Sequence, residues 1–331
     1  MGFNFDSIVF DDAQIKIVGI GKTGISTINH AILTTRLKGA KGVEFITVST
    51  PFADLSADEA TKHIVLEEQS PDWPDQPEAT IADPTRCEGD YEKIFNAIGK
   101  ADMVIVVTGA GCAITTAGAL FVAEIARKLE IPTIGLVAFP FAFEGQSRAK
   151  TASAGIEAMK QRTDSTVVVQ SDKLVCKELA GDQSLSVSEA SRKVDEALVK
   201  ALVAMTAIIV WPGLVCTDFR DVKIILCNGG LAAFSWGESA GENRAEKAVE
   251  MAISSPLLCG YDLKKCKGLL ILITCNDHAV SEVQHIIDFL QKVAGEDVNI
   301  IFGDTVADFS EKEPPNGLLR VSIIATGFQQ S

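Results

Sequence analysis

The chain has 331 residues, the length of about two domains, and 47% of them are apolar, which is enough for sizeable cores. With 44 acidic and 30 basic residues the formal net charge is −14, and a charge of this sign repels nucleic acid and anionic lipid. We therefore expect no nucleic-acid partner.

The sequence carries no recognisable membrane span or signal sequence. Its longest apolar stretch, Ala201 to Val210, is much shorter than the roughly 20 residues that cross a bilayer. The eight cysteines form no C-x-x-C pair, as expected of reduced thiols, and the four histidines have no metal-ligand spacing. These features predict a cytoplasmic protein without direct membrane insertion and without a metal site formed by its side chains.

The first predicted element is a buried strand over residues 15–20, followed by a glycine-rich turn and a helical stretch. Gly19, Gly21 and Gly24 have the G-x-G-x-x-G spacing of loops that approach a dinucleotide phosphate. On this spacing alone a Rossmann oxidoreductase is an alternative, with Glu44 or Asp54 binding the ribose. The sequence shows no catalytic histidine or Tyr-Lys signal for that activity.

The same turn imitates the end of a P-loop, because Lys22 and Thr23 follow Gly21. A P-loop also needs a glycine five positions before Gly21, and Lys16 occupies that position. A P-loop is therefore excluded.

A second strand, over residues 103–108, leads through a loop of small residues into a helix that we expect to open at Thr115 or Thr116. Gly109 and Gly111 let the backbone of this loop turn tightly, and the two threonines add hydroxyl donors. The first N–H groups of a helix have no internal partner and carry partial positive charge, so phosphate oxygens bind there. Two such loops in one half of the chain predict a nucleotide site.

Strands and helices alternate through the first half of the chain, which predicts a parallel sheet covered by helices on both faces. A ligand would bind at the carboxyl ends of these strands. The predicted strands cover residues 15–20, 43–49, 103–108, 133–138 and 166–170.

A long apolar helix follows, because Ser186 and Glu189 form a capping box and apolar residues then recur at helical spacing until Trp211. Beyond it we expect a second, smaller α/β domain. Its predicted helices lie near residues 218–226 and 242–252, and its predicted strands near 269–274, 298–302 and 319–325.

From about Ile15 to Gly327 the chain resembles the bacterial division protein FtsZ of the tubulin superfamily. The resemblance lies in four segments that follow the family's order: PFAFEGQSR at 140–148, DSTVVVQSDKL at 164–174, PGLVCTDFRDVK at 212–223 and GENRAEKAVEMAISSPLL at 241–258. It implies the tubulin/FtsZ fold, with a Rossmann-like GTP-binding domain over residues 1–183, a central helix over 184–210 and a C-terminal polymerisation domain over 211–331.

The resemblance further implies a GTPase that assembles head to tail, in which the next subunit completes the active site with Asp218 and Asp221. Two carboxylates at the start of a helix can orient a water molecule for attack on the γ-phosphate. The alternative is that Thr217 and Asp218 cap the helix and Asp221 complements its dipole.

Binding roles also follow from the resemblance. Asp195, or its neighbour Glu196, would accept hydrogen bonds from guanine, Glu144 would hold the ribose, and Arg148 would reach ribose or phosphate, unless it only pairs with Glu144. The phosphates would contact residues of the two glycine-rich loops: Gly19, Gly21, Lys22, Gly24, Ser26, Gly109, Gly111, Thr115 and Thr116. The implied cofactors are GTP or GDP and Mg²⁺, which phosphates and water could hold.

The chain departs from the family where the phosphates would bind. The family's GGGTGTG loop is replaced by Gly111-Cys112-Ala113-Ile114-Thr115-Thr116-Ala117, and Lys22 and Ser26 replace a glycine and an asparagine in the first loop. Two interpretations stay open: a divergent GTPase in which Lys22 offsets the lost glycines, or a paralogue that is indifferent to nucleotide and acts as a filament component or regulator. The expected partner is a second copy of this chain, or another FtsZ. Since the sequence given ends at Ser331 without an adaptor-binding tail, we expect no direct tethering to division adaptors.

Overall fold

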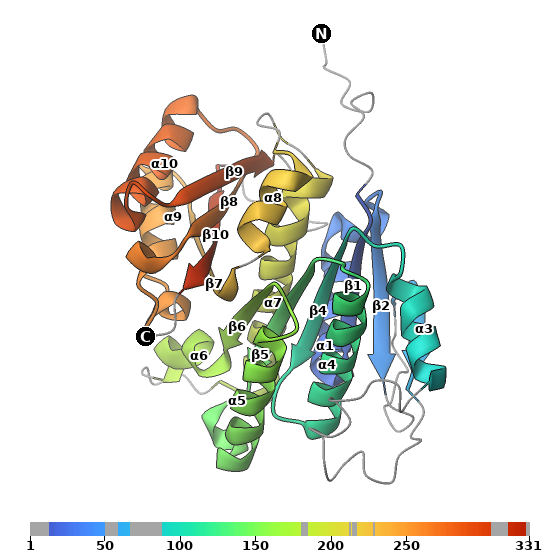
Figure 1. The fold of residues 1–331 in the computed structure, drawn as a ribbon. Coiled ribbons are helices and arrows are strands. Elements are labelled where there is room, and N and C mark those ends of the chain that lie inside the picture. The colour runs from blue at the N-terminus through green and yellow to red at the C-terminus, as the bar shows by residue number, and fades with distance from the viewer. Residues whose placement is uncertain are drawn as a thin grey trace.

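The computed structural model describes residues 13–49, 59–66, 88–179, 185–211, 213, 217–227, 229–305 and 317–328. Within these residues the strands form one ten-stranded sheet in the order β3-β2-β1-β4-β5-β6-β7-β10-β8-β9 (Figure 1). The strands are β1 (Ile15–Ile20), β2 (Val43–Ser49), β3 (Lys62–Val65), β4 (Met103–Gly109), β5 (Thr133–Phe139), β6 (Ser165–Gln170), β7 (Gly230–Ser239), β8 (Gly268–Cys275), β9 (Asn299–Thr305) and β10 (Leu319–Phe328). The α-helices are α1 (Gly21–Thr34), α3 (Glu88–Ile98), α4 (Ala113–Lys128), α5 (Gln146–Lys160), α6 (Ser171–Leu179), α7 (Val187–Val210), α8 (Phe219–Leu226), α9 (Arg244–Ile253) and α10 (Val280–Ala294).

The strands from β3 to β7 run parallel, and helices cover both faces of this part of the sheet. Alternate residues of β1 show the two faces: Ile15 and Ile17 are buried with α1 and α7, whereas Val18 and Ile20 are buried with α3 and α4. The predicted α/β class and its doubly covered parallel sheet are confirmed.

The C-terminal strands extend the same sheet. β7 pairs in parallel with β6 and antiparallel with β10, which pairs in turn with β8. One face packs against α9 and α10, and the other faces α7 and α8. We expected a second domain but did not predict β7, because its sequence GLAAFSWGES is interrupted by glycine and serine and lacks strict alternation.

The long helix α7 lies between these two parts, as expected from its sequence. Ser186 and Glu189 form the predicted capping box, with Ser186 Oγ accepting from the Glu189 N–H, and the helix ends at Val210. Its side chains share one core with Ile17 of β1 and Ile324 of β10. No helix in the described part of the chain has the length and apolar character needed to cross a membrane.

Candidate functional site

A cavity of about 460 Å³ opens where β4 and β5 end. The first turns of α1, α4 and α7 and the loop after β5 form its walls. Parallel sheets bind ligands at this edge, as the sequence predicted. Seven of the residues that we expected at a nucleotide line the cavity: Lys22, Ser26, Gly109, Thr115, Glu144, Arg148 and Asp195.

The other glycines of the two loops shape the backbone around the cavity. A Cβ on Gly19 would lie 2.5 Å from the carbonyl oxygen of Gly24, and a Cβ on Gly24 would lie 2.3 Å from that of Val107, so both glycines allow α1 to pack closely on the sheet. Gly21 and Gly111 have φ angles of +67° and +101°, which side chains rarely adopt. These four positions need glycine for turning and packing.

Helix α4 begins earlier than expected, at Ala113 rather than at Thr115 or Thr116, with Cys112 as its N-cap. Cys112 and Ala113 have side chains where the resembling family has glycine, and alanine favours the helix more than glycine does. Thr115 consequently lies in the first turn and lines the cavity. Thr116 instead packs its methyl group against Gly155 of α5, and its Oγ1 has no hydrogen-bond partner within the described residues.

Cys112 lines the cavity as well, although we did not propose it as a site residue. Its side chain is exposed at the N-terminus of α4. Partial burial acts to raise the pKa of the thiol, but hydrogen bonds from Thr115 and the Ile114 backbone, together with the charge of Arg148, outweigh it and lower that pKa below its ordinary value. We expected this helix to start at Thr115 or Thr116, so the sequence did not identify Cys112 as the residue at the helix N-terminus.

Two cationic side chains line the cavity, and they differ in their pairing. Arg148 forms an ion pair with Glu144, which also accepts a hydrogen bond from the Phe141 N–H at 2.9 Å. The alternative that these two residues pair with each other is therefore realised. Lys22 forms no ion pair with any residue that the structure describes, so its ammonium group is available to an anion.

Asp195 of α7 faces the cavity and is bonded to α1. Ser26 Oγ donates to Asp195 Oδ2 at 2.6 Å and Thr27 Oγ1 donates to Oδ1 at 3.2 Å. Burial of the carboxyl raises its pKa, although these two hydrogen bonds oppose the shift. Glu196 lies beside a different cavity, between α1, α7 and the C-terminal strands. Of the two candidates for guanine recognition, only Asp195 lines the predicted site.

The predicted acids lie far from this cavity. α8 follows the C-terminal end of α7 (Figure 1). Asp218 and Asp221 are exposed at the start of α8, whereas the cavity is lined by the N-terminal part of α7. The 24 residues of α7 correspond to about 36 Å. Asp218 caps α8, accepting from the Arg220 N–H at 2.9 Å, so the capping interpretation is correct for this residue. One subunit cannot bring both acids to its own cavity.

Of the two candidate ribose acids of the dinucleotide alternative, the structure describes only Glu44, which lies away from the cavity. Glu44 lies near the amino end of β2 and forms an ion pair with Lys16 of β1, away from the carboxyl ends of the strands. Asp54 lies outside the described residues.

Comparisons with known proteins agree with this geometry. The "Tubulin/FtsZ family, GTPase domain" matches residues 14–177 and the "FtsZ family, C-terminal domain" matches residues 230–329. A solved FtsZ dimer from M. jannaschii is 30% identical, with a TM-score of 0.81 over 96% of this chain and 89% of that one. The chain belongs to the tubulin/FtsZ family.

More distant tubulin/FtsZ relatives share the fold. CetZ2 from Haloferax volcanii, in a GTPγS-bound protofilament, is 18% identical with a TM-score of 0.71, over 96% of this chain and 94% of that one. CetZ1 from the same organism, a GDP-bound monomer, is 15% identical with a TM-score of 0.75, over 96% of this chain and 95% of that one. The recognition of a divergent FtsZ-like chain from its sequence is thus confirmed.

Proposed function

We propose that this chain is a cytoplasmic, GTP-binding cytoskeletal protein that polymerises head to tail and hydrolyses GTP between subunits. The cavity would hold the nucleotide, with Asp195 accepting from guanine, Glu144 and Arg148 near the ribose, and Lys22 and the start of α4 at the phosphates. Residues 1–183, 184–210 and 211–331 would act as the nucleotide domain, central helix and polymerisation domain.

The observation that carries this proposal is the distance between the cavity and the acids. The cavity is lined by α7 as far as Asp195, and the 15 residues from there to the end of α7 correspond to about 22 Å. Asp218 and Asp221 are exposed beyond that end, so we infer that they act on a nucleotide held by another molecule. A contact between unlike surfaces that does not close produces a filament. The solved structures of an FtsZ dimer and of a CetZ2 protofilament with bound GTPγS support the same assembly.

The donor set of the cavity is consistent with magnesium held mainly by phosphate and water. Among the described residues no three His, Cys, Asp or Glu side chains are grouped to hold a metal. Mg²⁺ would neutralise charge that develops on the phosphates. Lys22 would bind phosphate oxygens beside it, while Asp218 and Asp221 of the neighbouring subunit would orient the attacking water.

A specific observation also supports the second candidate, a paralogue that does not depend on nucleotide. Cys112, Ala113, Thr115 and Ala117 stand where the family's loop has glycines, and α4 begins within this segment. A Cβ at these positions reduces the room for close contact between backbone N–H groups and phosphate.

The nucleotide released from the denatured, purified protein distinguishes these candidates. Bound GTP or GDP supports the first, no nucleotide supports the paralogue, and NAD would contradict both. Phosphate release per subunit should rise with protein concentration, since each site needs a neighbour. Asp221→Ala should stop turnover and leave GTP binding and filaments intact; loss of binding instead would contradict the interfacial role.

A further inference from the structure

The segment that carries the two acids is attached to the edge strand β9. Thr217 Oγ1 donates to the carbonyl oxygen of Phe302 at 2.9 Å, directly before Asp218. Upstream, Gly213 lies so close to Asp304 that a Cβ on it would be 2.1 Å from the Asp304 carbonyl oxygen and 2.6 Å from the Asp304 side-chain Cγ. Both contacts are on β9, two residues apart, so Gly213 and Thr217 lie beside the same strand.

Asp304 is a buried ionisable group that the proposed chemistry does not use. The residue is only 1% exposed. His278 Nε2 lies 3.3 Å from Asp304 Oδ2, and the His278 side chain is 7% exposed. A carboxylate is costly to bury unless polar partners hold it. His278, on the β8–α10 loop, is one such partner of Asp304, and Gly213 of the segment that follows α7 packs closely against the same residue.

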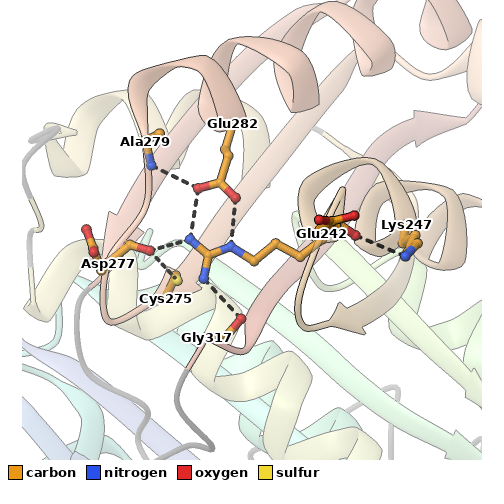
Figure 2. Close-up of polar contacts among 8 residues, drawn as sticks. Glu242, Lys247, Cys275, Asp277, Ala279, Glu282 and Gly317 are labelled. Atoms are coloured by element: carbon orange, nitrogen blue, oxygen red, sulfur yellow. Dashed lines mark hydrogen bonds and ion pairs between the residues drawn. The ribbon is translucent and has the colours of Figure 1, made fainter.

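Arg244 holds the loop that carries His278 (Figure 2). Arg244 Nε and Nη2 donate to the Glu282 carboxylate at 2.7 and 2.9 Å. The same guanidinium donates to the carbonyl oxygens of Gly317, at 3.0 Å, and of Asp277, the residue before His278. Glu282 Oε2 also accepts from the Ala279 N–H at 2.9 Å, so the loop is fixed on both sides of His278.

These contacts connect Arg244, through the loop that carries His278, to Asp304 on β9, the strand that also contacts Gly213 and Thr217. We propose that Asp304, held by His278, is a positioning residue that fixes residues 217–221 so that Asp218 and Asp221 meet the nucleotide of the neighbouring subunit. The proposal rests on the proposed function. Asp304 itself touches neither nucleotide nor water in this scheme; it acts through the backbone at Gly213 and through β9.

The physical reason is that hydrolysis depends on the geometry of the acids as well as on their presence. A displacement of about 1 Å at a reacting group can lower a rate about a hundredfold. α8 has only 8 residues, so its position depends on its attachments. Loss of the attachment should therefore lower turnover without affecting the nucleotide cavity.

The test compares Asp304→Ala, Asp304→Asn and His278→Gln with the parent chain. We expect kcat per assembled subunit to fall about ten- to a hundredfold in Asp304→Ala, and less in Asp304→Asn, which keeps a hydrogen-bonding group. The Kd for GTP of the unassembled protein should not change. Amide hydrogen exchange over residues 217–227 should become faster, and this measurement does not depend on activity.

Gly213→Ala changes the other partner of the contact between Gly213 and Asp304. Its Cβ would clash with Asp304 and displace the segment before α8, so this variant should show the same loss of kcat. Ser235→Ala is the matched control: Ser235 is a buried polar residue of β7 whose hydroxyl has no partner within the described residues, and it should change neither turnover nor exchange. If Asp304→Ala does not fold, the same measurements of kcat and hydrogen exchange on Asp304→Asn and Gly213→Ala test the proposal.

Asp221→Ala, measured in parallel, separates the two proposals. If Asp221→Ala hydrolyses GTP normally, the proposed function is wrong. If Asp221→Ala is inactive but the Asp304 and Gly213 variants keep the parent kcat and the parent exchange over residues 217–227, only the positioning role is wrong. A lower kcat with unchanged exchange in that segment also contradicts it.

Discussion

Ser26 and Asp195, 169 residues apart in the sequence, are joined by a hydrogen bond of 2.6 Å that connects α1 to α7 at the cavity. The bond fixes the Asp195 carboxylate beside the place where we propose that guanine binds. The same bond and the burial of the group lead to two separate expectations for this residue.

The first expectation for Asp195 concerns the preference of the cavity for guanine over adenine. Asp195→Ala should weaken GTP binding about ten- to a hundredfold, which corresponds to about 1.5–3 kcal/mol for hydrogen bonds to a charged group. ATP binding should change little, so the preference for GTP is lost. Titration with both nucleotides measures this. Glu196→Ala is the matched control, because Glu196 lines the other cavity.

The second expectation for Asp195 concerns the stability of the folded chain in the absence of nucleotide. Because burial raises the pKa of Asp195 in the folded chain, the charged form is disfavoured there, and stability falls as the pH rises from the unfolded pKa through the folded one. Asp195→Asn should therefore raise the melting temperature at pH 7 and have little effect near pH 3. A variant that melts earlier than the parent at pH 7 would contradict this sign.

Lys22 should supply the main attraction for the triphosphate. Lys22→Ala should weaken GTP binding and also reduce the dependence of Kd on salt concentration, since one ionic contact is lost. Binding titrations at several ionic strengths test both effects. Lys100→Ala, which removes an exposed lysine outside the cavity, should leave affinity and salt dependence unchanged.

Cys112 should report on occupancy of the cavity. Its lowered thiol pKa predicts alkylation by iodoacetamide at a lower pH than for an ordinary thiol. GTP should slow this alkylation, because phosphates bound at the start of α4 would cover the sulfur. Mass spectrometry of the digested protein can follow Cys112 beside the exposed Cys176 and Cys259, which should react equally with and without GTP.

Glu238 should link α7 to the C-terminal strands in a pH-dependent way. Lys200 Nζ and Arg320 Nε lie 2.9 Å from Glu238 Oε1. Burial acts to raise the pKa of Glu238, but the two cations outweigh it and lower that pKa. The contribution of these two ion pairs to stability is therefore present above the pKa that Glu238 has in the unfolded chain. It is lost as the pH falls through the pKa that Glu238 has in the folded chain.

Glu238→Gln should thus destabilise the chain by about 1–3 kcal/mol at pH 7, and the difference should shrink below about pH 4. Denaturant unfolding at both pH values measures this. Glu250→Gln, at an exposed position of α9, should have no such effect. Equal losses at both pH values would show that the effect is not electrostatic.

The sequence by itself determined the elements whose signals are local. Apolar runs such as IKIVGI and MVIVVTG identify buried parallel strands, and the Ser186–Glu189 box identifies the start of α7, because strand burial and helix capping depend on neighbouring residues. The glycine spacing predicted where a nucleotide site would lie, and the four family segments identified the family. Strand β7 was missed because its pairing with β6 and β10 outweighs a weak local pattern.

Only the tertiary structure decided which side chains meet. Asp195 and Glu196 are equivalent in sequence, but successive helix residues point about 100° apart, so only one faces the cavity. The start of α4 depended on side chains that replace glycines, and the attachment of Gly213 to Asp304 joins segments that are adjacent only in the folded chain. The sequence predicted α7 as one long helix, but only the fold shows that its N-terminal part lines the cavity while Asp218 follows its other end.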